Sequence, residues 1–378
     1  MVTPKTAKAL ARKNIRCLKP CVHGGKVWEA IQKTEKSTLL NFSSSINPFG
    51  SSQKAVESIA NSLENIPFYP DSNSTLLREA IAGRFEPISA DNIVVGNGST
   101  ELIYLFAETF LEKNDIALIP APTFGEYENA VRKADGKPVY FKLGSGLCFE
   151  AEGFIRRMKK DVKVVFLCSP NNPTSMLIPH RTLVSVVEAA LEEGVLVCLD
   201  ENFLEFVDEE KQVSLIGCVK NFPNLFVFQS FTKVFGLTGL RVGYGAGSEE
   251  MIEVLSNGKM PWSVNCLGQV GALTALEDKE HLEKCHNLMK TERGFLANKL
   301  KQVRGFEPYP ADANYFLVNI KDSGFTASQL REEMLKHGIL IRDCSSFRGL
   351  DNYHIRVAVR TREENKQLLG ALSEIIEK

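Results

Sequence analysis

Short runs of apolar residues alternate with amphipathic stretches through the middle of the chain. Five such runs lie within 92–98, 115–124, 163–173, 194–203 and 224–233. Runs that are apolar on both faces are typical of buried parallel strands. Between them, STELIYLFAETFLEK, FGEYENAVRKA and HRTLVSVVEAALEEG have the apolar spacing of helices. This alternation predicts an α/β fold, with a mostly parallel central sheet covered by helices on both sides.

The pattern changes after about residue 260. Long charged helices are expected there, one of them within 277–303, followed by the short strand candidates ANYFLVNI, GILIRDC and YHIRVAV. We therefore expect residues 41–260 to form a large domain and residues 261–378 a smaller α+β domain. The first part of the chain is less regular, and we expect residues 1–40 to form an arm that packs near the small domain.

Charge and composition exclude several classes of partner. The 378 residues contain 45 Lys and Arg against 46 Asp and Glu, a net charge of -1. Such a balance creates no broad field for nucleic acid or an anionic membrane. No apolar stretch reaches the roughly 20 residues that span a bilayer, and the first residues lack the apolar core of a secretory signal. We expect a cytoplasmic protein that binds neither nucleic acid nor membranes.

The nine cysteines are an odd number and fit reduced thiols better than a disulfide framework. Cys168 and Cys198 lie inside apolar runs, so we expect them in the core. Cys17 and Cys21 could be half of a metal site, but no second pair completes it in the sequence. No metal is therefore expected.

Polar residues follow several of the predicted strands, at the edge where open α/β sheets collect ligands. Ser99 and Thr100 come after two glycines and before a helix, a pattern that fits a phosphate site, although taken alone it favours a simple glycine turn with a Ser/Thr cap. Asn172 precedes a proline and could aim its amide at this edge or simply form a turn. Asp200 follows a buried run, where a carboxylate needs a cationic partner.

Lys233 also follows a buried strand, after Ser230 and Thr232. Loss of water lowers the pKa of a lysine and favours its reaction with an aldehyde, whereas a lysine on a solvated loop is the usual alternative. Arg241 can bind a phosphate. Together the strand ends offer phosphate-binding turns, an amide, a carboxylate and an amine. One cofactor needs all of these groups, pyridoxal 5′-phosphate (PLP).

Six segments in order, GNGSTELI, APTFGEYE, SPNNPT, LDENF, SFTK and GLRVGY, resemble the fold-type-I PLP-dependent aminotransferases, in the histidinol-phosphate aminotransferase subgroup. The resemblance runs from about residue 22 to the end. It implies that Lys233 binds PLP covalently, Asp200 pairs with the pyridine nitrogen and Asn172 donates to the 3-oxygen. Phe124 would stack on the ring. The remaining cofactor-binding residues that it implies are Ser99, Thr100, Ser230 and Arg241 at the phosphate, with Thr232 beside them.

The same resemblance implies substrate and partner contacts. Arg356 in HIRVAV resembles the arginine that binds the substrate α-carboxylate, and Arg360 on the same strand face could be a second ligand or a surface charge. Tyr69 in PFYPD resembles the tyrosine that reaches the cofactor phosphate of the partner subunit. A homodimer with shared active sites is therefore expected.

Several stretches resemble one branch of the family more closely, the L-threonine O-3-phosphate decarboxylases of cobalamin biosynthesis. They are HGG (23–25), NFSSSINPFG, MPWSVN and ILIRDCSSFRGLDNYHIRVAVR. This branch implies a small phosphorylated amino acid as the substrate. The further substrate-binding residues are then His23, Gly24, Gly25, Asn47 and Arg342. The blander alternatives are an ordinary turn at His23, an exposed arginine at Arg342, and a core position for Trp262.

Three positions bear on the choice of reaction. Phe203 stands where histidinol-phosphate aminotransferases usually have a tyrosine, and the decarboxylases have phenylalanine there too. Lys26 stands where the decarboxylases have asparagine. Ser175 stands where the family commonly has glycine. We predict decarboxylation of L-threonine O-3-phosphate to (R)-1-amino-2-propanol O-2-phosphate. Histidinol-phosphate transamination and decarboxylation of L-serine O-phosphate are the alternatives. A regulator with this fold would carry an added DNA-binding module, and the sequence has no sign of one.

Overall fold

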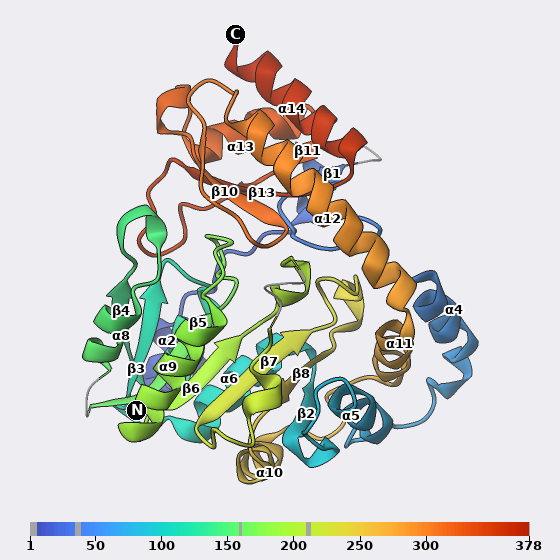
Figure 1. Ribbon diagram of the computed structural model, residues 1–378, viewed down its shortest axis with the longest axis vertical. Helices are drawn as coiled ribbons and strands as arrows, with labels where there is room; N and C mark the ends of the chain where they lie inside the picture. The colour runs from blue at the N-terminus through green and yellow to red at the C-terminus, as the bar shows by residue number, and fades with distance from the viewer. Residues whose placement is uncertain (1–5, 35–38, 159–160, 209–212, 378) are drawn as a thin grey trace, which may run out of the picture.

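The computed structural model describes residues 6–34, 39–158, 161–208 and 213–377 (Figure 1). A large sheet with its helices occupies one end of the molecule and a smaller sheet the other. The long helix α12 (Lys279–Leu300) runs from the side of the large sheet to the smaller one. No helix in the described ranges is both long and apolar enough to cross a bilayer.

The central sheet has seven strands in the order β2-β8-β7-β6-β5-β3-β4. Strand β8 runs antiparallel to both its neighbours, β2 and β7, and the other pairs are parallel. The carboxyl ends of all strands except β8 therefore lie at one edge, and the expected mostly parallel α/β sheet is confirmed. The bounds are β2 (Ile93–Gly96), β3 (Ile116–Ala121), β4 (Lys137–Lys142), β5 (Val162–Cys168), β6 (Leu196–Asp200), β7 (Leu225–Ser230) and β8 (Gly243–Ala246).

The sequence pattern did not reveal β4 or β8. Strand β4 is a half-exposed edge strand, so it has no buried apolar run. Strand β8 reads GYGA, and its first glycine is required by a close approach: a Cβ on Gly243 would lie 2.5 Å from the backbone nitrogen of Ser99. Because glycine is needed for this close approach, β8 lacks the run of apolar residues that marks the other strands in the sequence.

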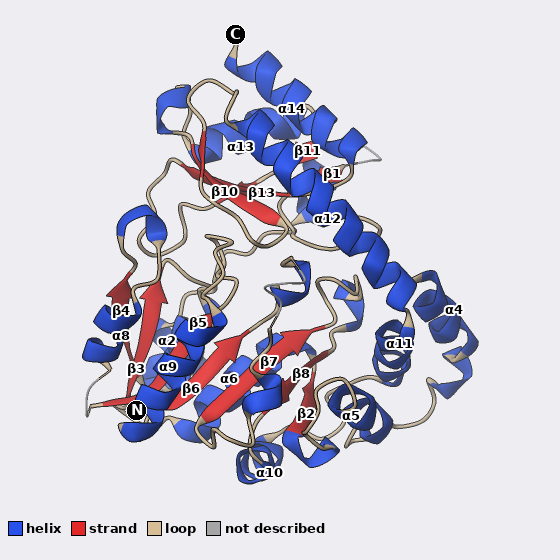
Figure 2. Cartoon of the chain, viewed as in Figure 1, coloured by secondary structure: helices blue, strands red, loops and turns tan. Residues whose placement is uncertain are grey.

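Helices cover both faces of the central sheet (Figure 2). One core cluster joins the sheet to α6, α7 and α10, and it contains Cys168 and Cys198, which confirms their expected burial. The other joins the opposite face to α5, α8 and α9. The helices of this part are α4 (Gln53–Asn61), α5 (Thr75–Ala82), α6 (Gly98–Phe110), α7 (Glu126–Lys133), α8 (Ala151–Arg157), α9 (His180–Glu192), α10 (Glu249–Gly258) and α11 (Cys266–Glu277).

The second sheet is antiparallel, in the order β12-β13-β10-β9. Its register places Arg342 on β12 directly opposite Arg356 on β13. Helices α12, α13 and α14 accompany it at this end of the molecule (Figure 1). The bounds are β9 (Glu307–Pro308), β10 (Tyr315–Asn319), β12 (Arg342–Asp343), β13 (His354–Ala358), α13 (Ala327–Lys336) and α14 (Arg362–Ile376).

The N-terminal residues touch both parts of the molecule. Helix α2 packs on α7 beside the central sheet, where Asn14 Nδ2 donates to the carbonyl of Lys133 at 2.8 Å. Helix α3 packs on α13, and β1 pairs in parallel with β11. The expected domain boundaries near residues 40 and 260 stay predictions, and residues 1–5 and 35–38 of the expected arm lie outside the described residues. The bounds are α1 (Ala7–Leu10), α2 (Lys13–Cys17), α3 (Val27–Thr34), β1 (Leu40–Asn41) and β11 (Ile339–Leu340).

Candidate functional site

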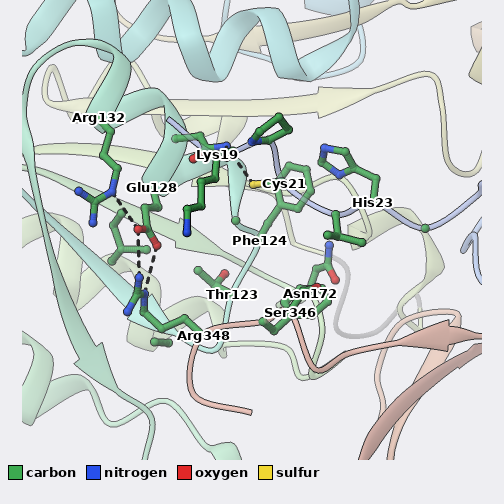
Figure 3. Close-up of a pocket in the computed structure, with 18 of the residues that line it drawn as sticks. Lys19, Cys21, His23, Thr123, Phe124, Glu128, Arg132, Asn172, Ser346 and Arg348 are labelled. Carbon is green, nitrogen blue, oxygen red and sulfur yellow. Dashed lines mark hydrogen bonds and ion pairs between the residues drawn. The ribbon is translucent and has the colours of Figure 1, made fainter. Parts of the chain in front are cut away.

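A cleft of about 1600 Å³ opens at the carboxyl edge of the central sheet and extends to the second sheet and the N-terminal residues (Figure 3). It brings together residues that are more than 300 positions apart in the chain, from His23 to Arg356. Of the residues expected from the sequence, those that line it are His23, Gly24, Gly25, Phe124, Asn172, Thr232, Lys233, Arg342 and Arg356.

Lys233 lies in the loop after β7, with Nζ 5.2 Å from the centre of the Phe203 ring. Burial, with a smaller contribution from the charge of Arg356, lowers the pKa of its amine to about 8, and the charge of Asp200 opposes this shift. Asn47 fixes this loop, because its backbone nitrogen donates to the Lys233 carbonyl at 3.0 Å and its Nδ2 to the Val234 carbonyl at 2.8 Å. About a tenth of the amine is therefore uncharged at pH 7, far more than for an ordinary lysine, and the uncharged form is the one that reacts with an aldehyde.

The side chain of Asn47 is engaged with that loop and does not line the cleft. Its expected contact with substrate stays a prediction. In the structure Asn47 instead fixes the peptide segment that contains Lys233.

Asp200 ends strand β6 and is almost fully buried. Tyr127 donates its hydroxyl to Oδ2 at 2.6 Å, and the backbone nitrogen of Asn202 donates to Oδ1 at 2.8 Å. Burial raises the pKa of this carboxyl to about 6, although both hydrogen bonds act to lower it. A protonated ring nitrogen beside Asp200 would stabilise the ionised form. Sequence reasoning missed Tyr127, whose one signal was its place three residues after Phe124, on the inward face of α7.

The turn between β2 and α6 and the loop after β7 form a basic cup. Arg241 Nη1 donates to the Thr238 carbonyl at 3.2 Å and lies 3.5 Å from Thr232 Oγ1. A Cβ on Gly98, whose φ is +72°, would lie 2.5 Å from Arg241 Nη2. Ser230 Oγ is buried and has no hydrogen-bond partner among the described residues. An orphaned hydroxyl, a guanidinium and a helix N-terminus fit a phosphate group.

Two further cofactor candidates belong to the same turn. Ser99 accepts a hydrogen bond from Asn202 Nδ2 at 3.1 Å, so Asn202 connects this turn to Asp200. Thr100 lies in the first turn of α6. The residues expected at the cofactor that do not themselves line the cleft are Ser99, Thr100, Asp200, Ser230 and Arg241. They belong to the strand ends and turns next to Thr232 and Lys233, which do line it, and their groups fit the phosphate and the pyridine nitrogen of PLP.

Asn172 and Phe124 lie on the walls of the cleft (Figure 3). Asn172 Oδ1 accepts a hydrogen bond from Arg356 Nη1, and Arg356 Nη2 donates to the Ser43 carbonyl at 3.2 Å. Arg356 Nε is buried with no hydrogen-bond partner in the described part of the chain. Phe203 packs edge-on against Tyr315 with ring centres 4.9 Å apart, so an apolar ring occupies this side of the site.

Arg342 and Arg356 place two positive charges in the cleft. They face each other across β12 and β13, and their side chains are 6% and 7% exposed. Burial lowers the pKa of Arg342 to about 10, and the charge of Arg356 contributes. Neither forms an ion pair with a carboxylate within the ranges that the structure describes. An anionic ligand with two charged groups would relieve this repulsion.

Two charged residues whose roles the sequence did not decide, Arg360 and Lys26, lie outside the cleft. Arg360 donates to Glu364 at 2.7 Å and to the Asn41 carbonyl at 3.3 Å, which makes it a structural ion pair. Lys26, which precedes α3, pairs with the exposed Glu29 of that helix at 3.0 Å. Neither lines the cleft.

Ser175 occupies a left-handed backbone conformation, with φ +66°. Its carbonyl accepts from the backbone nitrogen of Asp312 at 2.9 Å and its Oγ from that of Ala313 at 3.1 Å. This conformation explains why glycine is common at the position, and the hydroxyl supplies a contact that glycine lacks.

Tyr69 and Trp262 lie on the surface. They are 81% and 50% exposed, with ring centres 4.7 Å apart. The core position considered for Trp262 is therefore wrong, because its ring stacks on an exposed tyrosine instead of packing inside. Tyr69 does not line the cleft of its own chain.

Comparisons with known proteins agree with this geometry. The family model "Aminotransferase class I and II" matches residues 37–372. A histidinol-phosphate aminotransferase of Methanosphaera stadtmanae is 32% identical over 344 residues, which cover 90% of this chain and 92% of the relative. A relative from Caldanaerobacter subterraneus, provisionally named a threonine-phosphate decarboxylase, is 36% identical over 366 residues and 95% of both chains.

Solved structures are similar over most of their length. The L-threonine-O-3-phosphate decarboxylase of Porphyromonas gingivalis has a TM-score of 0.80 at 25% identity, covering 90% of this chain and 100% of that one. The histidinol-phosphate aminotransferase of Sinorhizobium meliloti in complex with PLP has a TM-score of 0.87 at 21% identity, covering 97% of each chain. The second likeness supports the fold alone, while the two relatives divide between two reactions.

Proposed function

The chain belongs to the aminotransferase class I and II family, a family of PLP enzymes, and on that premise we propose that it decarboxylates L-threonine O-3-phosphate to (R)-1-amino-2-propanol O-2-phosphate. The carbon–carbon bond to the carboxylate breaks, carbon dioxide leaves, and a proton takes its place on Cα. Bound PLP supplies the electron sink for this bond cleavage.

One observation carries the proposal, the pair of buried guanidiniums at Arg342 and Arg356 in the cleft that Lys233 also lines. L-Threonine O-3-phosphate has a carboxylate and a phosphate at the two ends of one small molecule. Arg356 would bind the carboxylate and Arg342 the phosphate, because a planar guanidinium matches both groups. Histidinol phosphate offers a phosphate but no carboxylate, so this compound would leave one guanidinium unpaired, whereas the 2-oxoglutarate of the alternative reaction could pair both.

The other residues of the site have separate parts in this proposal. Asp200 would hold the proton of the pyridine nitrogen, and Tyr127 fixes the carboxylate for it. Gly98, Ser99, Ser230 and Arg241 would hold the cofactor phosphate. Lys233, with a pKa near 8, can hold the proton that Cα receives.

A homodimer belongs to the same proposal. Large apolar side chains are exposed around Tyr69, and exposed apolar patches of this kind mark interfaces between proteins. Tyr69 would then reach the cofactor phosphate of the partner subunit. The side chains are Leu63, Ile66, Phe68, Leu76, Met260 and Trp262.

The test is to incubate the holoenzyme with L-threonine O-3-phosphate and to measure carbon dioxide and the phosphorylated amino alcohol. A second sample receives histidinol phosphate with 2-oxoglutarate, and glutamate is measured. Carbon dioxide release in the first sample is expected. Glutamate formation in the second without carbon dioxide in the first would replace the proposal by histidinol-phosphate transamination, which the Methanosphaera stadtmanae relative supports.

L-Serine O-phosphate is the third substrate to include. It differs from the threonine compound by one methyl group, which is worth only about 1–3 kcal/mol in a pocket. The ratio of kcat/KM for the two phosphorylated amino acids measures this preference directly.

A further inference from the structure

A buried carboxylate lies behind the wall of the cleft. Glu126, the first residue of α7, is 7% exposed. Its Oε1 is 2.7 Å from His23 Nε2, and its Oε2 accepts a hydrogen bond from the Tyr104 hydroxyl at 2.5 Å. Burial acts to raise the pKa of Glu126, but the hydrogen bonds from His23 and Tyr104 hold it below its ordinary value. The carboxylate is therefore ionised at neutral pH.

His23 lines the cleft (Figure 3), and its contact with Glu126 connects this carboxylate to it. Its side chain is half exposed, and its ring centre is 5.9 Å from that of Phe124. Because Nε2 is bonded to Glu126, the other ring nitrogen, Nδ1, is the polar atom of the imidazole that remains for a ligand.

The backbone around His23 is held separately from its ring. Arg342 donates to the Val22 carbonyl, and the backbone nitrogen of Gly25 donates to Ser43 Oγ at 2.9 Å. A Cβ on Gly24 would lie 2.5 Å from the Ser43 carbonyl oxygen. The turn is therefore fixed against Ser43 and Arg342 whatever occupies position 126, and Glu126 determines only the orientation of the imidazole.

We propose that Glu126 is a positioning residue for substrate recognition: it holds His23 as an imidazolium, with Nε2–H on the carboxylate, so that Nδ1–H donates a hydrogen bond to the phosphate group of the substrate, beside Arg342. This inference rests on the proposed function, because it assumes a phosphorylated substrate. A hydrogen bond contributes most when its donor is already oriented before the ligand arrives.

The sign of a substitution separates this role from a simple charge effect. A carboxylate near an anionic ligand repels it, so a Glu126 without a positioning role would weaken phosphate binding. Glu126→Gln would then lower KM. If Glu126 holds His23 as an imidazolium, the same substitution replaces the anionic acceptor by a weaker neutral one. KM for L-threonine O-3-phosphate then rises about tenfold, as expected for the loss of a hydrogen bond to a charged group, with kcat within about twofold.

Glu128→Gln is the matched control. It removes the same charge two residues further along α7, from a carboxylate that also lines the cleft but bonds Arg132 and Arg348 instead of His23 (Figure 3). Its KM is expected to stay within about twofold or to fall. A KM that rises equally in both variants would assign the effect to a general disturbance of α7 and overturn the inference.

A double-variant cycle tests whether Glu126 acts through His23. In the His23→Gln background, adding Glu126→Gln is expected to change KM less than about twofold. Independent, multiplicative effects would overturn the inference. Thermal unfolding of each variant identifies any loss of folded protein, and His23→Gln alters a half-exposed side chain, so it keeps the test valid if Glu126→Gln is unstable.

Calorimetric titration of the holoenzyme with inorganic phosphate provides a readout without turnover. Bound PLP fills the cofactor phosphate site, so the added phosphate reports on the substrate site. Glu126→Gln and His23→Gln are each expected to weaken phosphate binding about tenfold, and unchanged binding in both would overturn the inference. If wild-type enzyme binds phosphate in this way but releases no carbon dioxide from L-threonine O-3-phosphate, the proposed function fails while the role of Glu126 stands.

Discussion

The hydroxyl of Tyr127 is expected to set the affinity for PLP through Asp200. Tyr127→Phe removes the 2.6 Å hydrogen bond to Oδ2 and keeps the ring, which stacks on Phe166 with centres 5.4 Å apart. A hydrogen bond to a charged group contributes about 1.5–3 kcal/mol, and one pKa unit corresponds to about 1.4 kcal/mol. The pKa of Asp200, about 6 in the wild type, should therefore rise by about one to two units in the variant.

This shift predicts a specific pH dependence. Asp200 stabilises the protonated pyridine nitrogen only when it is ionised, which the wild type achieves over most of the range above pH 6. In the variant a large fraction of the carboxyl is protonated at pH 7, so PLP binding weakens about 3- to 20-fold more between pH 8.5 and 6.5 than in the wild type. The affinity for PLP falls at lower pH because a carboxyl with a raised pKa becomes protonated earlier as pH falls, and Asp200 then loses the negative charge that stabilises the pyridinium.

The assay is titration of apoenzyme with PLP, followed by absorbance or by quenching of protein fluorescence, at intervals from pH 6 to 9. Tyr244→Phe is the matched control, because it removes a buried tyrosine hydroxyl with a 2.6 Å hydrogen bond to Gln229 Oε1, away from Asp200. Equal pH profiles for Tyr127→Phe and the wild type would refute the reasoning. A profile that changes equally in both variants would assign it to core packing.

Three further predictions concern the cofactor site and the surface. Lys233→Ala is expected to abolish the visible absorbance of bound PLP in the purified protein, and its persistence would place the covalent link elsewhere. Asp200→Asn should raise the free energy of unfolding of the apoenzyme at pH 8 by up to about 3 kcal/mol, measured with urea. The reason is that burial raises the pKa of Asp200 from 3.8 to about 6, so ionisation of this carboxyl opposes folding as pH rises. Equal stability of the two proteins would contradict the burial argument. Tyr69→Glu, at an 81% exposed position, should lower the molecular mass measured by light scattering from that of a dimer to that of a monomer. Lys26→Glu, at the exposed residue that pairs with Glu29, should leave that mass unchanged.

The strands of the central sheet could be predicted because each buried strand carries a run of apolar residues, and the chemical residues at their ends follow from those runs. Lys233 and Asp200 each come directly after such a run. Tyr127 and Glu126 could not be predicted in the same way. They lie on a helix between charged neighbours, and only the packing of α7 on the sheet turns one toward Asp200 and the other toward His23.

Positions set by backbone conformation or register are also hidden in a single sequence. Ser175 reads as an ordinary polar residue, and its left-handed conformation appears only in the folded loop. The pairing of Arg342 with Arg356 depends on the antiparallel register of β12 and β13, which a separation of 14 positions does not determine. The two arginines were expected at the site, but their mutual repulsion was not.

The division of the site between two parts of the chain explains why the cofactor is easier to infer than the reaction. The groups that fit PLP come from the carboxyl edge of the central sheet and its adjoining turns, where Asp200, Ser230 and Lys233 follow buried strands. The groups that would orient the substrate come from the second sheet and the N-terminal turn, at Arg342, Arg356 and His23. Because bond cleavage depends on how the substrate is oriented over the cofactor, a change in the second set can alter the reaction without altering the first.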